Sequence, residues 1–143
     1  MLKGIPAAIS PELMSVLMRM GHGDDLVLAD GNFPADSHAR RIVRADGQPA
    51  TIMLDAILRV FPVDTFVEYP ARVMLPTAPH APEPAIWSDF RSLLQKHEGR
   101  FIPLDPVERF QFYDLAKSAY AIVATGETAL FANVILRKGV VTE

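Results

Sequence analysis

The chain has 143 residues, of which half are hydrophobic and 22% are charged, and its formal net charge is −3. This composition indicates one ordinary globular domain over residues 1–143 and excludes a disordered chain. The scattered Lys and Arg residues and the small negative charge argue against a nucleic-acid-binding surface. No apolar run approaches the roughly 18 residues of a membrane span, and the lack of cysteine excludes disulfides and thiol catalysis. We therefore expect a cytoplasmic protein with neither a membrane nor a nucleic-acid partner.

The first predicted helix begins at Pro11 and ends at Gly21. Ser10 is a suitable N-cap, and proline is favoured at the first helical position because its missing N–H has no partner there. His22 follows the helix directly and lies between Gly21 and Gly23, where few neighbours shield it. Histidine can donate and accept protons near neutral pH, so His22 is a candidate for acid–base chemistry.

A buried strand is predicted next, over Leu26–Ala29, because an unbroken apolar run is typical of a strand that is covered on both faces. Asp30 stands at the carboxyl end of this strand, and the residues up to Pro34 form a turn. Open α/β sheets place their ligand crevices at such strand ends. We therefore expect Asp30 to contribute to a small-molecule site.

The rest of the chain alternates between predicted strands and helices, which indicates α/β layers around a largely parallel sheet. Two short segments, 35–40 and the proline-rich 76–84, are expected to be loops. Helices are expected over about 49–61 and 85–98, and a fourth starts at the capping box of Asp105–Glu108. Strands are expected over 41–44, 65–69, 71–75, 100–102, 121–125 and 131–137.

Chain geometry limits how His22 and Asp30 can cooperate. Eight residues separate them, and a fully extended chain would place them up to roughly 26–29 Å apart. The two side chains can share a site within one subunit only if the segment Gly23–Asp25 folds back. Otherwise the site is completed across a subunit boundary.

The chain contains no phosphate-binding glycine loop, no HExxH metal signature and no GxSxG nucleophile elbow, and we expect no metal site. Function must therefore depend on individual polar residues, each of which also has a purely structural interpretation. His22 could cap the helix, and Asp30 could cap its turn through Asn32. Arg109 and Tyr113 share one helix face, and a buried Asn133 would need hydrogen-bond partners. Asp64 completes the candidates, whereas His38, His80 and His97 are expected to be structural or solvated.

Several segments together resemble the fucose mutarotase/ribose pyranase family. They are LKGIPAAISPELMSVLMRMGHGDDLVLADGNFP, IVRADG, PVDTFVE and RFQFYDLAKSAYAIVATGETALFANVILRKGV. The resemblance covers Leu2 to Val140. GHGD followed in order by TGE and N-x-I-L is specific to the family, and NFP and RADG favour its fucose branch. The proline-rich segment 76–84 is the part least similar to the family.

The resemblance implies a three-layer α/β/α domain with a mixed, mostly parallel sheet. It also implies a homo-oligomeric ring, a pentamer or decamer, with active sites at the subunit interfaces. Members interconvert the anomers of a free sugar, here L-fucose, without metal or cofactor. The roles that follow are acid–base catalysis by His22 and Tyr113, and sugar binding by Asp30, Asp64, Met74, Arg109, Phe131 and Asn133.

The chain departs from the family pattern at Phe131, where the family has tyrosine, and at Ala132, where the fucose branch usually has glycine. The missing hydroxyl leaves the identity of the sugar open. One alternative is an isomerase for ribose or another monosaccharide that exchanges pyranose and furanose forms. The other alternative is a ring protein that binds sugar without catalysis.

Overall fold

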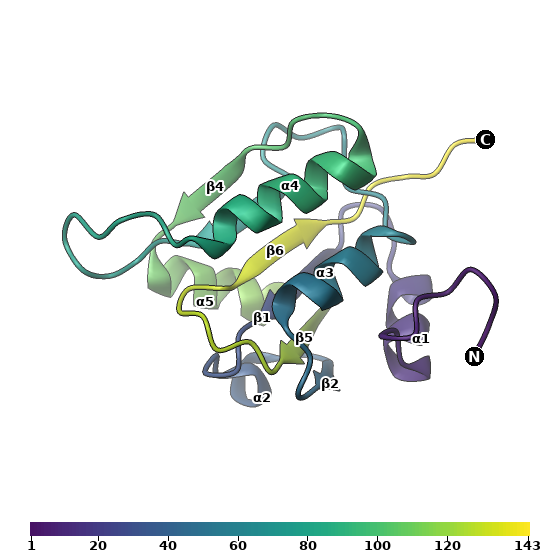
Figure 1. Ribbon diagram of the computed structural model, residues 1–143, viewed down its shortest axis with the longest axis horizontal. Helices are drawn as coiled ribbons and strands as arrows, with labels where there is room; N and C mark the ends of the chain where they lie inside the picture. Colours follow the sequence, from purple (N-terminus) through teal and green to yellow (C-terminus); the bar gives the residue numbers. More distant parts are fainter.

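The computed structural model describes residues 1–143 and contains one six-stranded sheet (Figure 1). The strands are β1 (Asp25–Ala29), β2 (Ile42–Ala45), β3 (Ala71–Met74), β4 (Leu104–Val107), β5 (Ala121–Thr125) and β6 (Val134–Arg137). Their order across the sheet is β2-β5-β1-β6-β3-β4. Only β6 runs antiparallel to its neighbours, β1 and β3, and every other pair is parallel. The sheet is therefore mixed and mostly parallel, as predicted.

Helices cover both faces of the sheet, which makes the fold three-layered. They are α1 (Pro11–Arg19), α2 (Ala35–His38), α3 (Ala50–Leu58), α4 (Ile86–Glu98) and α5 (Arg109–Ser118). The larger apolar cluster packs α1, α3 and α4 against one face, and the smaller cluster packs α2 and α5 against the other. In Figure 1, α3 and α4 lie in front of the sheet and α5 lies behind it.

The central strands supply apolar side chains to both clusters. In β1, Leu26 and Leu28 belong to the larger cluster, whereas Val27 and Ala29 belong to the smaller one. This alternation places an apolar side chain at every position from Leu26 to Ala29, because neither face of the strand meets water. The continuous apolar run in the sequence is explained by this burial.

Two expectations near the N-terminal half were wrong. The first helix ends at Arg19, two residues before Gly21. Gly21 does not have a left-handed backbone, whereas Gly23, on the other side of His22, has a φ of 87°. The segment expected to be a loop after Pro34 contains the short helix α2.

The region 65–69, predicted to be a strand, forms bends instead. The Phe66 N–H donates to the side chain of Asp64 at 3.1 Å, and the Phe66 side chain is 72% exposed. A local side-chain bond of this kind competes with the ladder of a strand. The chain therefore turns here and enters the sheet only at Ala71.

The segment 100–108 was also predicted wrongly. No strand forms over 100–102, and the capping box expected at Asp105–Glu108 lies instead in β4 and just after it. β4 is an edge strand, and a proline such as Pro106 is tolerated there because the outer side of an edge strand has no neighbour that needs its N–H. The helix begins three residues later, at Arg109, and its N-cap is Glu108, whose carboxylate accepts from the N–H groups of Phe110 and Gln111.

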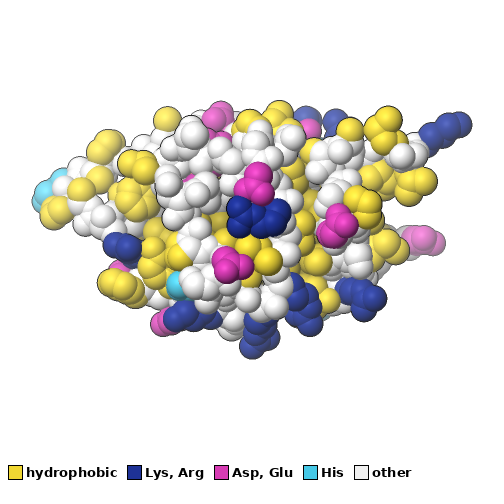
Figure 2. Space-filling model, turned by 90° about the horizontal axis from the view of Figure 1, so that it is seen from below, with side chains coloured by type: hydrophobic (Ala, Val, Ile, Leu, Met, Phe, Trp, Pro, Cys, Tyr) yellow, Lys and Arg dark blue, Asp and Glu magenta, His cyan; other side chains and the backbone are white.

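The surface offers no candidate membrane span, since no helix has both the length and the apolar character that crossing a bilayer requires. On the face shown in Figure 2, acidic and basic side chains are spread among hydrophobic ones.

Candidate functional site

A cavity of about 190 Å³ opens at the carboxyl ends of β1 and β3. It is smaller than the roughly 300–1,000 Å³ of pockets for drug-sized ligands, so it suits one small ring. Six of the eight predicted site residues line it, namely Asp30, Met74, Arg109, Tyr113, Phe131 and Asn133. Strand order explains the convergence, because parallel strands end at the same edge and β6 begins there.

Asp30 and Asn133 form the polar floor of the pocket. The Asn133 side chain accepts from the Asp30 backbone N–H at 2.8 Å and donates to the Asp30 carboxylate at 2.9 Å. Both residues are buried, with exposed fractions of 7% and 3%. The carboxylate also accepts from the Asn32 N–H at 2.9 Å, so Asp30 caps its turn and lines the pocket at once. Its orientation is fixed, and free lone pairs remain that can accept sugar hydroxyls.

Arg109 and Tyr113 stand one helical turn apart on α5, and the Arg109 Nε–H donates to the Tyr113 hydroxyl oxygen at 3.0 Å. The Tyr113 ring packs edge-on against Phe33 and lies 5.1 Å from the ring of His38. A guanidinium donor stabilises negative charge that develops on the phenol oxygen when the proton leaves. This pair can therefore move a proton at the pocket mouth.

The remaining walls are largely apolar. They come from Phe33, Met74, Leu130 and Phe131. Phe131 has a left-handed backbone, with a φ of 57°, which is uncommon for a bulky side chain. A pocket with a polar floor and apolar walls suits a ligand that carries both hydroxyls and exposed C–H groups.

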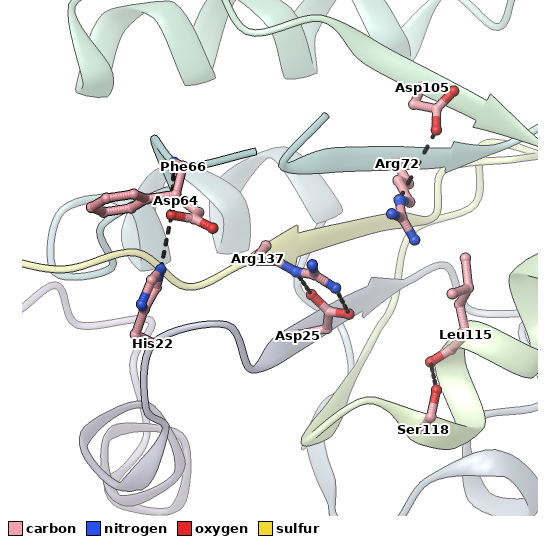
Figure 3. A network of polar contacts seen from close by, with 9 residues as sticks. All are labelled: His22, Asp25, Asp64, Phe66, Arg72, Asp105, Leu115, Ser118 and Arg137. Atoms are coloured by element: carbon pink, nitrogen blue, oxygen red, sulfur yellow. Dashed lines mark hydrogen bonds and ion pairs between the residues drawn. The ribbon is translucent and has the colours of Figure 1, made fainter. Parts of the chain in front are cut away.

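His22 and Asp64, the other two predicted residues, lie outside this pocket and pair with each other (Figure 3). The His22 Nε2 and Asp64 Oδ1 atoms are 3.1 Å apart, and the His22 ring contacts the ring of Phe66 at a centroid distance of 5.2 Å. The His22 side chain is 44% exposed, whereas that of Asp64 is 2% exposed. The buried Asp64 carboxylate therefore fixes one side of the His22 imidazole, and the other side of the ring is open to solvent.

The chain between His22 and Asp30 does not fold back. The Gly23 N–H donates to the Lys138 carbonyl and the Lys138 N–H donates to the Asp24 carbonyl, each at 2.8 Å. These bonds extend the β1–β6 pairing beyond the amino end of β1, where the ion pair between Asp25 and Arg137 also lies (Figure 3). One chain therefore carries two separate groups of predicted site residues, at opposite ends of β1.

The charge of Asp64 is retained in spite of its burial. Burial disfavours the charged form, but the N–H of Phe66 and the side chain of His22 outweigh it and hold the pKa of Asp64 below its ordinary value. The Arg100 guanidinium fixes the same residue through its carbonyl oxygen, at 2.9 Å. An ionised Asp64 can only accept at its 3.1 Å contact with the His22 Nε2 atom, so it orients the imidazole.

Sequence reasoning missed the four other residues that line the pocket, Asn32, Phe33, Thr77 and Leu130. The turn that follows Asp30 did carry a signal for Asn32 and Phe33, because a turn at a strand end faces the crevice. His38, expected to be structural or solvated, packs against Tyr113. No three or more His, Cys, Asp or Glu side chains lie close enough together to hold a metal ion.

A strand-end pocket with a fixed carboxylate–amide pair, an arginine–tyrosine pair and apolar walls defines a small-molecule site of the kind that binds polar rings. The chain belongs to the RbsD / FucU transport protein family, which it matches over residues 3–141.

Related proteins have closely similar sequences and structures. The fucose mutarotase of Homo sapiens is 49% identical over 145 residues, covering 97% of this chain and 94% of that protein. The crystal structure of the fucose mutarotase from Streptococcus pneumoniae in complex with L-fucose is 44% identical, with a TM-score of 0.93, covering 99% of this chain and all of the other. Bacillus subtilis RbsD, solved with D-ribose, shares the fold at a TM-score of 0.71 and 21% identity, covering 94% and 95%.

Proposed function

We propose that this chain is an isomerase that interconverts the α and β anomers of free L-fucose. The observation that carries the proposal is the convergence of Asp30, Asn133, Arg109 and Tyr113 on one pocket. The proposal is further supported by the human fucose mutarotase, whose sequence is 49% identical over almost the whole of both chains.

Anomer exchange needs only proton transfers. A base removes the proton of the anomeric hydroxyl while an acid protonates the ring oxygen, and the C–O bond of the ring breaks to give an open-chain aldehyde. Rotation about the neighbouring C–C bond and closure on the other face of the carbonyl regenerate both proton carriers. Each placed acid or base contributes about 10²–10⁴-fold, so the reaction requires no cofactor.

His22 and Tyr113 are the acid–base pair of this proposal. Tyr113 stands at the pocket and its hydroxyl accepts a hydrogen bond from Arg109, whereas His22 is oriented by the ionised Asp64. Asp30 and Asn133 hold sugar hydroxyls. The apolar side chains of Met74 and Phe131 face the C–H groups and the methyl group that L-fucose carries in place of a hydroxymethyl group.

The separation of His22 from Tyr113 within one chain supports a site at a subunit boundary. A homo-oligomeric ring, a pentamer or a decamer, would bring the His22–Asp64 pair of one subunit to the pocket of another. Exposed Phe66 beside His22, and exposed Phe110 and Leu130 beside the pocket, supply apolar surface for such a contact. The cytoplasmic location expected from the sequence stays a prediction.

Ribose pyranose–furanose exchange is the second candidate, because Phe131 lacks the hydroxyl of the family tyrosine and this leaves the identity of the sugar open. The sequence comparison favours fucose, because the identity is 44–49% to fucose mutarotases and 21% to the ribose-bound structure. A sugar-binding protein without catalysis would be stabilised by sugar yet leave anomer exchange at the background rate.

NMR saturation transfer between sugar anomers tests the proposal. L-fucose, D-ribose and D-galactose are measured with the wild-type chain and with His22→Ala. We expect accelerated exchange of L-fucose anomers that His22→Ala removes. An unaltered rate in His22→Ala contradicts the catalytic role of His22, and no acceleration for any sugar contradicts the proposed function.

A further inference from the structure

Trp87 connects the pocket to the opposite side of the sheet. It is the only tryptophan of the chain, lies in the first turn of α4 and is 4% exposed. Its ring belongs to the larger apolar cluster, on the face away from α5. Its indole Nε1–H nevertheless donates to the backbone carbonyl of Phe131 at 3.1 Å, and Phe131 lines the pocket.

The hydrogen bond from Trp87 helps to hold the backbone of Phe131 in place. Its φ of 57° is unfavourable for a bulky L-residue and persists only where the surroundings hold it. Two residues later, Asn133 is fixed by its paired bonds to Asp30. The segment 131–133 is therefore anchored at both ends, by Trp87 at Phe131 and by Asp30 at Asn133, with the buried Ala132 between them.

We propose that Trp87 is a positioning residue for sugar binding, because it fixes the left-handed backbone of Phe131 and thereby the place of the Phe131 ring in the pocket. This role rests on the proposed function, since it concerns the same site. Trp87 does not line the pocket and acts only through Phe131. Sugar that packs against Phe131 changes the environment of the indole, so the single tryptophan also reports binding.

Trp87→Phe removes the N–H donor and keeps an aromatic ring in the core. We expect the KM for L-fucose to rise about fivefold, as for the loss of one hydrogen bond, with kcat largely unchanged because uniform binding is lost. The matched control is Phe90→Leu, one turn along α4 in the same cluster and with no bond to the pocket. It should lower the melting temperature and leave KM unaltered.

The second measurement uses the wild-type chain, so it holds even if Trp87→Phe does not fold. Titration with L-fucose should produce a saturable change in tryptophan emission, and an acyclic polyol should not. The proposal is overturned if Trp87→Phe keeps the wild-type KM, if Phe90→Leu raises KM as much, or if saturating L-fucose leaves the emission unchanged. If the wild-type chain exchanges no anomers, the proposed function fails, while the emission titration still decides whether Trp87 senses the pocket.

Discussion

The Nε2 atom of His22 lies 3.1 Å from Oδ1 of Asp64, at the end of β1 opposite to the one that carries Asp30. The chain thus carries two groups of candidate site residues, the His22–Asp64 pair and the pocket around Asp30, at opposite ends of β1. In the proposed homo-oligomeric ring, a head-to-tail contact would join the His22–Asp64 pair of one subunit to the pocket of the next. The same contact would cover the exposed ring of Phe66.

Asp64→Asn should slow anomer exchange by roughly tenfold or more while the fold is retained. The change removes the charged partner that orients the His22 ring. Saturation transfer with L-fucose measures the rate. The control is Asp55→Asn, because Asp55 forms a similar pair with His97, at 2.8 Å, and neither of these residues lines the pocket. An equal loss of rate in the two variants contradicts a specific role for Asp64.

Tyr113→Phe should reduce kcat for L-fucose by about 10²–10⁴-fold, the usual contribution of a placed acid or base. Arg109→Lys should cost less, because a lysine keeps the charge but not the planar guanidinium that donates to the phenol oxygen at 3.0 Å. Ring packing of Tyr113 against Phe33 is unaffected by loss of the hydroxyl, so the melting temperature should be nearly unchanged. Wild-type kcat in Tyr113→Phe would remove Tyr113 from the acid–base pair.

Gly139→Ala should impair catalysis although it replaces no polar side chain. A Cβ at this position would lie 2.9 Å from the Asp64 Cα and 2.9 Å from the Val63 carbonyl oxygen, so the backbone that carries Asp64 must shift. We expect slower exchange and a lower melting temperature. Gly21→Ala is the matched control next to His22, because its nearest new contact is at 3.7 Å. Full activity of Gly139→Ala would show that the exact place of Asp64 is unimportant.

Acid stability should depend on Asp55, which joins α3 to α4. Hydrogen bonds from Lys96 and from His97 lower the pKa of Asp55 from 3.8 to about 2. Because the folded-state pKa is the lower one, this stabilisation is complete above about pH 4 and is lost as the pH falls towards 2. It amounts to at most about 2 kcal/mol, since Lys96 is exposed and its charge is screened.

Asp55→Asn tests this directly. Chemical denaturation between pH 7 and pH 2 should show a smaller decline of the unfolding free energy for the variant than for the wild type. Parallel curves for the two proteins would show that the Asp55 pairs contribute nothing to acid stability.

The strands of the sheet centre could be predicted because burial on both faces leaves an unbroken apolar run. This holds for Leu26–Ala29 and for Ala121–Thr125, which both match the observed strands within one residue. Edge strands and turns could not be predicted in this way, because they lack an unbroken apolar run. Pro106 reads as the start of a helix from its neighbours alone, and only its edge position in the sheet permits a strand there.

Part of the lining of the candidate pocket could be predicted for the same reason. Asp30 and Asn133 could be found because one ends a buried strand and the other is an amide among apolar residues. The role expected for Tyr113 came from the family resemblance. The pairing of His22 with Asp64 is a long-range contact that only the structure reveals. Forty-two residues separate His22 from Asp64, and no local pattern indicates that they meet. Trp87 gave no signal, since its polar contact is with a backbone atom 44 residues away.

Complementation between two inactive variants tests the subunit-boundary site most directly. His22→Ala and Tyr113→Phe are purified alone and also co-expressed, so that mixed oligomers form. If each site takes His22 from one subunit and Tyr113 from another, random mixing leaves roughly a quarter of the sites intact, and L-fucose anomer exchange should return to about that fraction of the wild-type rate. Mixed oligomers that stay as inactive as either variant alone would contradict a site shared between subunits.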